Sequence, residues 1–131
     1  VKELGGPQTP AIGFAIGFDR LVEVMEQIDK IPEPLPLDLF IISLGDTAME
    51  KGYHWSCELN QKGIRTEIDF RGKSLKALMK RADKLAARYV LIAGENELIE
   101  NAITLRNMNT KEQVSLSMED MIPELIKIFK K

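Results

Sequence analysis

The sequence has 131 residues, which suits one domain of ordinary size with its own core. Hydrophobic residues make up 44% and charged residues 29%, and the formal net charge is −2, so composition indicates a globular chain and excludes a general polyanion binder. A single cysteine, Cys57, excludes an internal disulfide, and a single histidine, His54, argues against a zinc site. Because no apolar run reaches the length of a membrane span, we expect an intracellular protein without one. The first residue is Val1 and not Met, so we expect a piece of a longer chain.

The chain begins with an apolar run that glycines interrupt. In PAIGFAIGFDRLVEVMEQI, residues 10–28, Gly13 and Gly17 stand inside this run, and the pair Asp19–Arg20 follows it. A strand leading into an amphipathic helix accounts for the pattern, and the glycines allow close backbone packing. A buried strand with glycines for packing is the plainest interpretation of these residues alone.

A proline-rich stretch separates this first block from the rest. KIPEPLPL carries a proline at every second position, which disfavours helix and favours a stiff, extended connector. We therefore predict a first block at residues 1–30, a linker at 31–36 and a second domain at 37–131.

The second domain opens with alternating strand and helix signals. The continuous apolar run at 39–44 predicts a strand buried on both faces. Asp46 or Thr47 can cap a helix that runs to about Lys62, where Gly63 ends it. Residues 64–70 alternate, which predicts a strand with one wetter face. The covered face is expected to hold Ile64, Thr66, Ile68 and Phe70, and the wetter face Arg65, Glu67 and Asp69.

The remaining elements complete an α/β fold. Ser74 caps a second amphipathic helix, and residues 88–94 predict another buried strand. Residues 102–106 and 113–117 flank a polar loop and predict a hairpin, and a last helix follows with Pro123 in its first turn. We predict an α/β domain with a mixed sheet of about five strands, three parallel plus a hairpin, flanked by helices. A strand–helix segment precedes it.

No catalytic motif stands out, but one stretch is basic. The sequence has no strand followed by G-x-G-x-x-G and no P-loop, and we interpret His54 and Cys57 as structural or surface residues. Residues 65–88 carry eight basic side chains against three acidic ones. Three of these basic side chains, Lys76, Lys80 and Lys84, share one side of the second helix, where they form either a solvated face or a phosphate-binding stripe. Open α/β sheets bind ligands beyond the carboxyl ends of their strands, which border this stretch.

Two longer strings resemble known proteins. LGGPQTPAIGFAIGFDRLVEVM resembles motif 3 of the class II aminoacyl-tRNA synthetases, most closely in the histidyl form. GIRTEIDFRGKSLKALMKRADKLAARYVLIAGENEL, with the later LRNMNTKEQ, resembles the anticodon-binding domain of the histidyl, threonyl, prolyl and glycyl enzymes. Together the two similarities cover nearly the whole chain.

The first similarity implies a fragment of a catalytic domain. In the family the arginine that matches Arg20 grips the ATP phosphates, and the glycines that match Gly13 and Gly17 line the ATP and histidine pocket. The parent protein is then expected to be a histidine–tRNA ligase that uses ATP and Mg²⁺. Since motifs 1 and 2 lie upstream in the family and are missing here, we expect these 131 residues alone to be inactive.

The second similarity implies an anticodon-binding surface for tRNA-His. Four positions match base contacts in the related threonyl domain: Gly72, Lys80, Glu97 and Arg106. Two flanking side chains, Arg71 and Lys73, are expected to contact backbone phosphates. The similarity further implies a cytoplasmic parent that forms a homodimer through its catalytic domain and has no DNA or membrane partner.

Three other interpretations remain open from the sequence. A synthetase-like paralogue could keep the fold and regulate instead of charging tRNA. A flavodoxin-like nucleotide-binding domain could use the same topology, although GDTAMEKG after the first strand lacks the glycines and hydroxyls that wrap a phosphate. A plain protein-interaction module would have no RNA affinity and no salt dependence.

Overall fold

The computed structural model describes residues 2–28, 35–72 and 74–130. The chain divides into two compact units, Val1–Pro34 and Leu35–Lys131, and each is treated by itself. Most of the linker predicted at 31–36 lies outside the described residues, which resume at Leu35.

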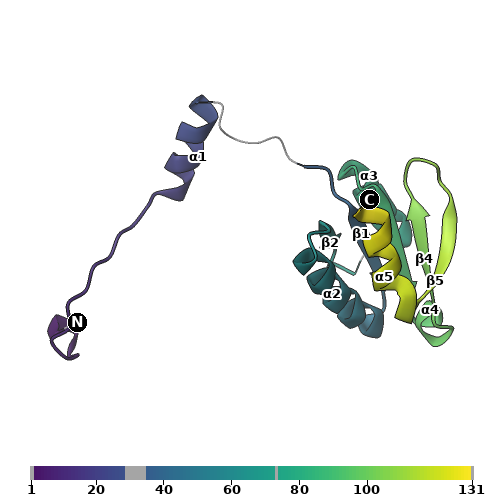
Figure 1. The fold of residues 1–131 in the computed structure, drawn as a ribbon, viewed down its shortest axis with the longest axis horizontal. Helices are drawn as coiled ribbons and strands as arrows, with labels where there is room; N and C mark the ends of the chain where they lie inside the picture. The colour runs from purple at the N-terminus through teal and green to yellow at the C-terminus, as the bar shows by residue number, and fades with distance from the viewer. Residues whose placement is uncertain (1, 29–34, 73, 131) are drawn as a thin grey trace. The chain divides into compact units, whose positions relative to one another are not determined.

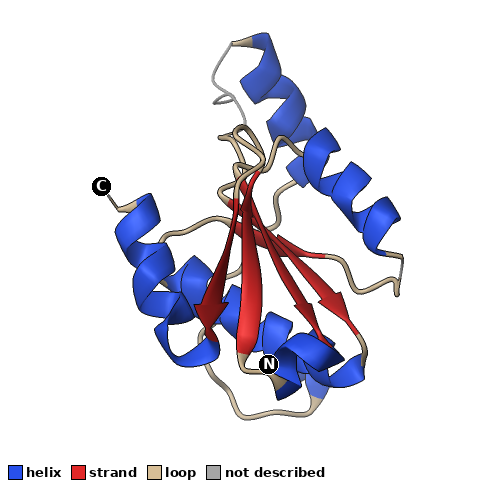
Figure 2. Ribbon diagram, turned by 90° about the vertical axis from the view of Figure 1, so that its right-hand side faces the viewer, coloured by secondary structure: helices blue, strands red, loops and turns tan. Residues whose placement is uncertain are grey.

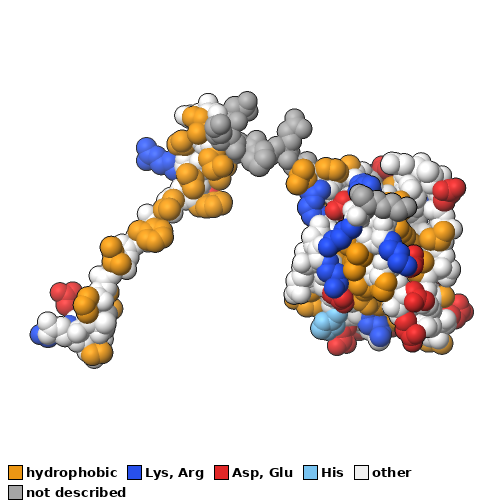
Figure 3. All heavy atoms as spheres, viewed as in Figure 1, with side chains coloured by type: hydrophobic (Ala, Val, Ile, Leu, Met, Phe, Trp, Pro, Cys, Tyr) orange, Lys and Arg blue, Asp and Glu red, His pale blue; other side chains and the backbone are white. Residues whose placement is uncertain are grey.

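The first unit contains a short 3-10 helix, η1 (Lys2–Leu4), and one α-helix, α1 (Phe18–Gln27). The helix predicted after the apolar run is confirmed, but residues 11–17 form no β-strand, because no described strand lies beside them to accept and donate the ladder hydrogen bonds. None of the residues of α1 is buried. Hydrophobic side chains therefore remain exposed along the unit, as Figure 3 shows, and they include Ile12, Phe14, Ile16, Phe18 and Leu21.

The second unit is built on one mixed five-stranded sheet. Its strands are β1 (Leu39–Leu44), β2 (Thr66–Ile68), β3 (Tyr89–Gly94), β4 (Ala102–Asn107) and β5 (Gln113–Ser117). Their order is β2-β1-β3-β4-β5, with β1 parallel to β2 and β3, and with β4 antiparallel to β3 and β5. Figure 2 shows the strands as a twisted fan between helices. The predicted three parallel strands plus a hairpin are confirmed.

Helices cover the two faces of the sheet unequally. On one face, α2 (Asp46–Gln61) and α5 (Met118–Phe129) pack through Leu59, Met121 and Leu125. On the other face, α3 (Leu75–Lys84) packs through Leu78 and Ala82. Figure 1 shows α5 lying across the sheet. Successive residues of β1 alternate between the two cores, so this central strand is covered on both sides, as its apolar run predicts.

Three local features differ from the sequence-based expectations. The second strand is only three residues long, and after it Asp69 is buried while Phe70 is 59% exposed, the reverse of the predicted alternation. A short helix, α4 (Glu95–Ile99), was not predicted. The last helix begins at Met118, where the Ser117 side chain accepts a hydrogen bond from the Asp120 backbone N–H, so Pro123 lies in its second turn. None of the described helices is long and apolar enough to cross a bilayer.

We predict that residues 35–131 fold without the first unit. All buried hydrophobic residues among those described come from Leu39 onward, so deleting residues 1–34 removes no core. The truncated chain should keep its melting temperature, measured by circular dichroism, and should associate less in light scattering because exposed apolar surface is removed.

A longer deletion, through Ile41, provides the control because it also removes Leu39 and Phe40, both fully buried. It should leave the chain unfolded. If the shorter deletion also unfolds the protein, the first unit is an integral part of this domain.

Candidate nucleic-acid interface

The three parallel strands end at the same edge of the sheet, and two adjoining hollows open there. One hollow, of about 350 Å³, lies beside the end of β1 and contains Asp46, Phe70 and Gly72 in its lining. The other, of about 520 Å³, lies between the ends of β1 and β3 and contains Glu95 and Glu97. We call the two together the strand-end groove. They share Leu44 and Gly45, so the two hollows adjoin at the end of β1.

Glu97 lies over the sheet on the side that α3 covers. Its Oε2 atom is 2.5 Å from the position that a Cβ on Gly94 would occupy. Gly94 pairs in register with Leu44, which packs against the α3 core, so both point to this side. The absence of a side chain at Gly94 therefore makes room for the Glu97 carboxylate.

Arg106 projects from β4 on the same side of the sheet. It pairs in register with Val90, a member of the α3 core. Its Nε atom is buried without a hydrogen-bond partner, and it makes no ion pair within the described part of the chain. The guanidinium is therefore available to an external acceptor.

The lysine stripe lies on the outward side of α3. The side chains of Lys76, Lys80 and Lys84 are exposed, whereas Leu78 and Ala82 face the sheet. None of the three lysines forms an ion pair with a described residue. Because α3 covers the face that carries Glu97 and Arg106, three of the four positions proposed for base contact lie on one side of the sheet.

A buried carboxylate organises the loop that enters α3. Asp69, whose side chain is 1% exposed, accepts hydrogen bonds from the Arg71 backbone N–H at 2.9 Å, from its Nε at 3.0 Å and from its Nη2 at 2.8 Å. Arg81 of α3 lies 3.3 Å from the same carboxylate through Nη1, and its Nη2 donates to Glu67 of β2 at 2.6 Å. The Glu67 hydrogen bond raises the pKa of Arg81 above its ordinary value.

This network bears on the expected phosphate contacts. Asp69 engages two of the three guanidinium nitrogens of Arg71 and offsets its charge, so Arg71 offers less to a phosphate than Lys80 does. Gly72, the fourth position proposed for base contact, follows with φ +58° and lines the strand-end groove. Lys73 lies outside the described residues.

The catalytic candidates lie in the first unit. Arg20 is exposed in the first turn of α1, and Gly17 is the residue before the helix. Gly13 has no atom within 4 Å of the position of a Cβ, so nothing in this unit requires a glycine there. Arg20, Gly13 and Gly17 are all exposed.

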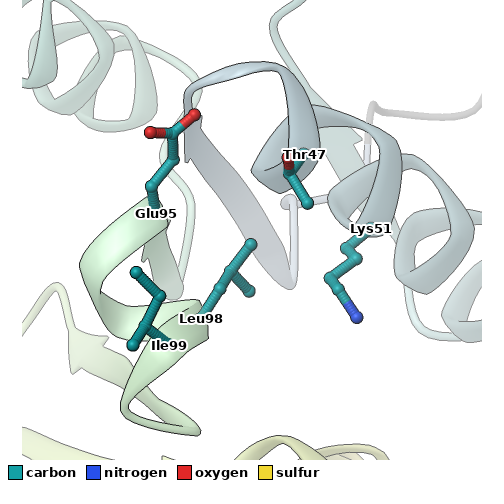
Figure 4. Close-up of a pocket in the computed structure, with 5 residues that line it drawn as sticks. All are labelled: Thr47, Lys51, Glu95, Leu98 and Ile99. Carbon is teal, nitrogen blue, oxygen red and sulfur yellow. The ribbon is translucent and has the colours of Figure 1, made fainter.

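A third hollow, of about 440 Å³, lies between α2 and α4. Figure 4 shows Thr47 and Lys51 on the α2 side and Glu95, Leu98 and Ile99 on the α4 side. Its single cation is balanced by a single carboxylate, and two aliphatic side chains complete the lining. Among the described residues, the lining has no aromatic side chain, and it includes none of the positions proposed for base contact.

Sequence reasoning missed Asp69 and Phe70 as organisers of the groove. The alternation in residues 64–70 predicted the opposite orientation for both. The pattern D-x-R, with the arginine two residues after an acid, was the one available signal for the Asp69–Arg71 pair. No pattern in the sequence indicated that Glu97 folds over Gly94, because that contact depends on α4.

The comparison with known families bears on this surface. The sequence profile of the family described as "Anticodon binding domain" matches residues 38–128. The chain belongs to the anticodon-binding domain family. The match spans all five strands and covers both sides of the strand-end groove.

Several curated relatives are named histidine–tRNA ligases. One from Desulforapulum autotrophicum is 59% identical over 128 residues, which cover 98% of this chain and 30% of the relative. One from Clostridium perfringens is 39% identical over 131 residues, covering 99% of this chain and 31% of the relative. The chain thus spans about a third of the length of the relatives it matches.

Solved structures give the same picture of the fold. The apo histidyl-tRNA synthetase of S. aureus superposes with a TM-score of 0.66 at 29% identity, over 82% of this chain and 32% of that one. The RNA-binding domain of a threonyl-tRNA synthetase from Cryptosporidium parvum has a TM-score of 0.61 at 22% identity, over 71% of this chain and 25% of that one. The latter likeness shows the fold alone.

We predict that Asp69→Asn lowers the free energy of unfolding by about 1–3 kcal/mol, because hydrogen bonds from charged donors to a buried carboxylate are among the stronger ones. Urea denaturation with an unchanged m-value measures the loss. Asp83→Asn is the matched control, since Asp83 is exposed on α3 and has no ion pair within the described residues. Equal stability of the two variants would contradict the organising role of Asp69.

Proposed function

We propose that the second unit binds the anticodon loop of tRNA-His and is the anticodon-binding part of a histidine–tRNA ligase. The observation that carries this proposal is 59% identity, over 98% of the chain, to a protein named histidine–tRNA ligase. Membership in the anticodon-binding domain family and the arrangement of the strand-end groove support it.

The proposed surface combines charge with base recognition. Lys80, on the exposed stripe, would neutralise a phosphate, and Arg71 would add a weaker contact because Asp69 holds it. Glu97 would accept from an exocyclic amino group, and Arg106 would donate to a guanine edge or a phosphate. Gly72 would let the RNA approach the backbone. RNA loops present splayed bases, which suit a hollowed α/β surface.

The first unit would belong to the catalytic domain of the whole protein. Arg20 suits an ATP phosphate because a guanidinium is always charged and can donate in a planar fork. Gly13 and Gly17 would let the backbone lie against ATP and histidine once neighbouring strands are present. ATP supplies the activation of the histidine carboxyl group, and Mg²⁺ accompanies its phosphates. The described residues contain no cluster of metal-ligating side chains, so the proposal includes no Mg²⁺ ligand from them.

The proposal extends to the setting of the whole protein. It would be a cytoplasmic enzyme that forms a homodimer through its catalytic domain and has no DNA or membrane partner. A regulatory paralogue remains the second candidate, because retention of the anticodon-binding fold does not require charging activity.

A flavodoxin-like nucleotide site is less consistent with the groove. Three carboxylates, from Asp46, Glu95 and Glu97, line it, and these repel a phosphate more than they bind it. The same carboxylates can accept hydrogen bonds from base amino groups. The groove therefore favours the RNA interpretation.

The direct test is a binding curve of residues 1–131 against a histidine anticodon stem-loop RNA and against the same stem with a scrambled loop. The proposal expects tighter binding to the native loop, with affinity falling as salt rises. Equal binding to both loops would refute anticodon recognition, and no binding at low salt would favour an interaction module.

Single substitutions should separate the two kinds of contact. Lys80→Ala should weaken binding to both RNAs by roughly 1 kcal/mol and reduce the salt slope by about one unit, as loss of one phosphate contact does. Arg106→Ala should instead reduce discrimination against a changed anticodon base by about 1–3 kcal/mol. Titrations at two salt concentrations measure both effects.

Lys51→Ala is the matched control because Lys51 is an exposed lysine on α2, which packs on the opposite face of the sheet. It should bind like the parent protein. If Lys80→Ala and Arg106→Ala also bind like the parent at both salt concentrations, the proposed surface is wrong.

We predict no histidine-dependent ATP–pyrophosphate exchange by residues 1–131. Arg20 is the single matched catalytic side chain, and activation requires ATP and histidine to be aligned by several groups at once. Radiolabelled pyrophosphate exchange measures the reaction, with the whole protein as positive control. Exchange above the blank would show that more of the active site is present than we propose.

A further inference from the structure

Phe70 is an exposed aromatic ring held at the edge of the strand-end groove. Its side chain is 59% exposed, and Tyr53 of α2, 50% exposed, lies beside it with ring centroids 6.1 Å apart at an interplanar angle of 60°. Burial of the neighbouring Asp69 turns Phe70 outward, because successive residues of an extended chain point to opposite sides. An aromatic ring that is exposed to solvent and packs beside a second ring suits a surface that binds another planar apolar group.

The hollow beside Phe70 has a lining of both polar and apolar groups. Its volume of about 350 Å³ falls in the range of small-molecule sites, roughly 300–1,000 Å³. Ser43 of β1 is part of the lining, but its Oγ is buried and lies against Gly52 of α2, so this hydroxyl does not face a ligand in the hollow.

Two further groups set the chemistry of this hollow. Asp46, in the first turn of α2, contributes a carboxylate, which can accept but not donate hydrogen bonds. Gly72 has φ +58° and nothing within 4 Å of the position of a Cβ, so Gly72 itself leaves open space beside the hollow. Guanine, adenine and cytosine carry an exocyclic amino group that can donate to Asp46, whereas uracil carries none.

From this arrangement we propose that the hollow holds one unstacked RNA base, which stacks on Phe70 and donates its exocyclic amino group to Asp46. The proposal rests on the proposed RNA binding and names how one loop base is held. Tyr53 lies beside Phe70. The hollow adjoins, at Leu44 and Gly45, the one that contains Glu97, which places that carboxylate next to the proposed base site.

RNA is favoured over a protein partner by the surrounding charge. Arg71, next to Phe70, keeps 55% of its side chain exposed, and the exposed lysines of α3 follow the same loop. An aromatic platform beside basic side chains is the usual arrangement for binding single-stranded nucleic acid.

The test uses residues 1–131 and the histidine anticodon stem-loop RNA, with the scrambled loop as control. Phe70→Leu keeps an apolar side chain but removes the π-face, and it should weaken binding about tenfold. Phe70→Trp should stay within about twofold of the parent, and its added indole emission should be quenched by the RNA. Val114→Ala, which removes exposed apolar surface from the α2–α5 side of the sheet, should have no effect.

A second variant tests the polar end of the pocket. Asp46→Asn should reduce the preference for amino-bearing bases over uracil at one loop position, measured with loops in which each base is replaced by uracil in turn. The parent protein should lose affinity on uracil replacement at that position, and Asp46→Asn should lose less.

The outcomes separate this inference from the proposed function. If the parent does not distinguish native from scrambled loop, the proposed function fails and the base pocket fails with it. If the parent distinguishes the two loops and Phe70→Leu binds as tightly as the parent, RNA recognition stands and the base pocket is wrong. The exposed ring would then be assigned to contact with a protein partner. If Phe70→Trp binds as weakly as Phe70→Leu without quenching, the ring has a packing role and the stacking proposal is overturned.

Discussion

The Asp69 carboxylate joins the end of β2, the loop after it and helix α3. Arg71 holds it from the loop and Arg81 holds it from α3, while the second arm of Arg81 reaches Glu67 on β2. Isolated ion pairs on a protein surface contribute little, but here one partner is almost fully buried and is bound by several donors. The position of Phe70 and Gly72 at the groove follows from this anchoring.

Sheet topology supplies the second constraint. Because β2, β1 and β3 are parallel, the loops that leave them meet at one edge, although they are far apart in the sequence. Antiparallel pairing of β4 with β3 then fixes Arg106 opposite Val90, on the side of the sheet that α3 covers. A one-residue shift in that register would turn the Arg106 side chain to the α2–α5 side.

Much of this arrangement could be predicted from the sequence. The apolar run of β1, the glycine that ends α2 and the alternation of the hairpin depend on local patterns, and these elements were predicted correctly. The predicted cap of α2 by Asp46 or Thr47 was wrong, because Gly45 precedes the helix and no described side chain caps it. The reversal at Asp69 and Phe70 could not be predicted, since a carboxylate is buried only when distant donors such as Arg81 reach it. Helix α4 is too short to have a periodic pattern. The contact of Glu97 with Gly94 depends on that helix, so this contact could not be predicted either.

Gly45 joins the two halves of the groove, and its backbone limits how the surface can change. With φ +105° the position disfavours any other residue, and a Cβ there would lie 2.6 Å from the Glu95 carboxylate. A side chain at the centre of the groove would require a strained backbone and a new position for the Glu95 side chain. Mutation can therefore change the side chains at the rim of the groove, such as Asp46, Phe70 or Glu97, more readily than it can change this central position. In evolutionary terms, the rim can vary while the glycine at the centre stays the same.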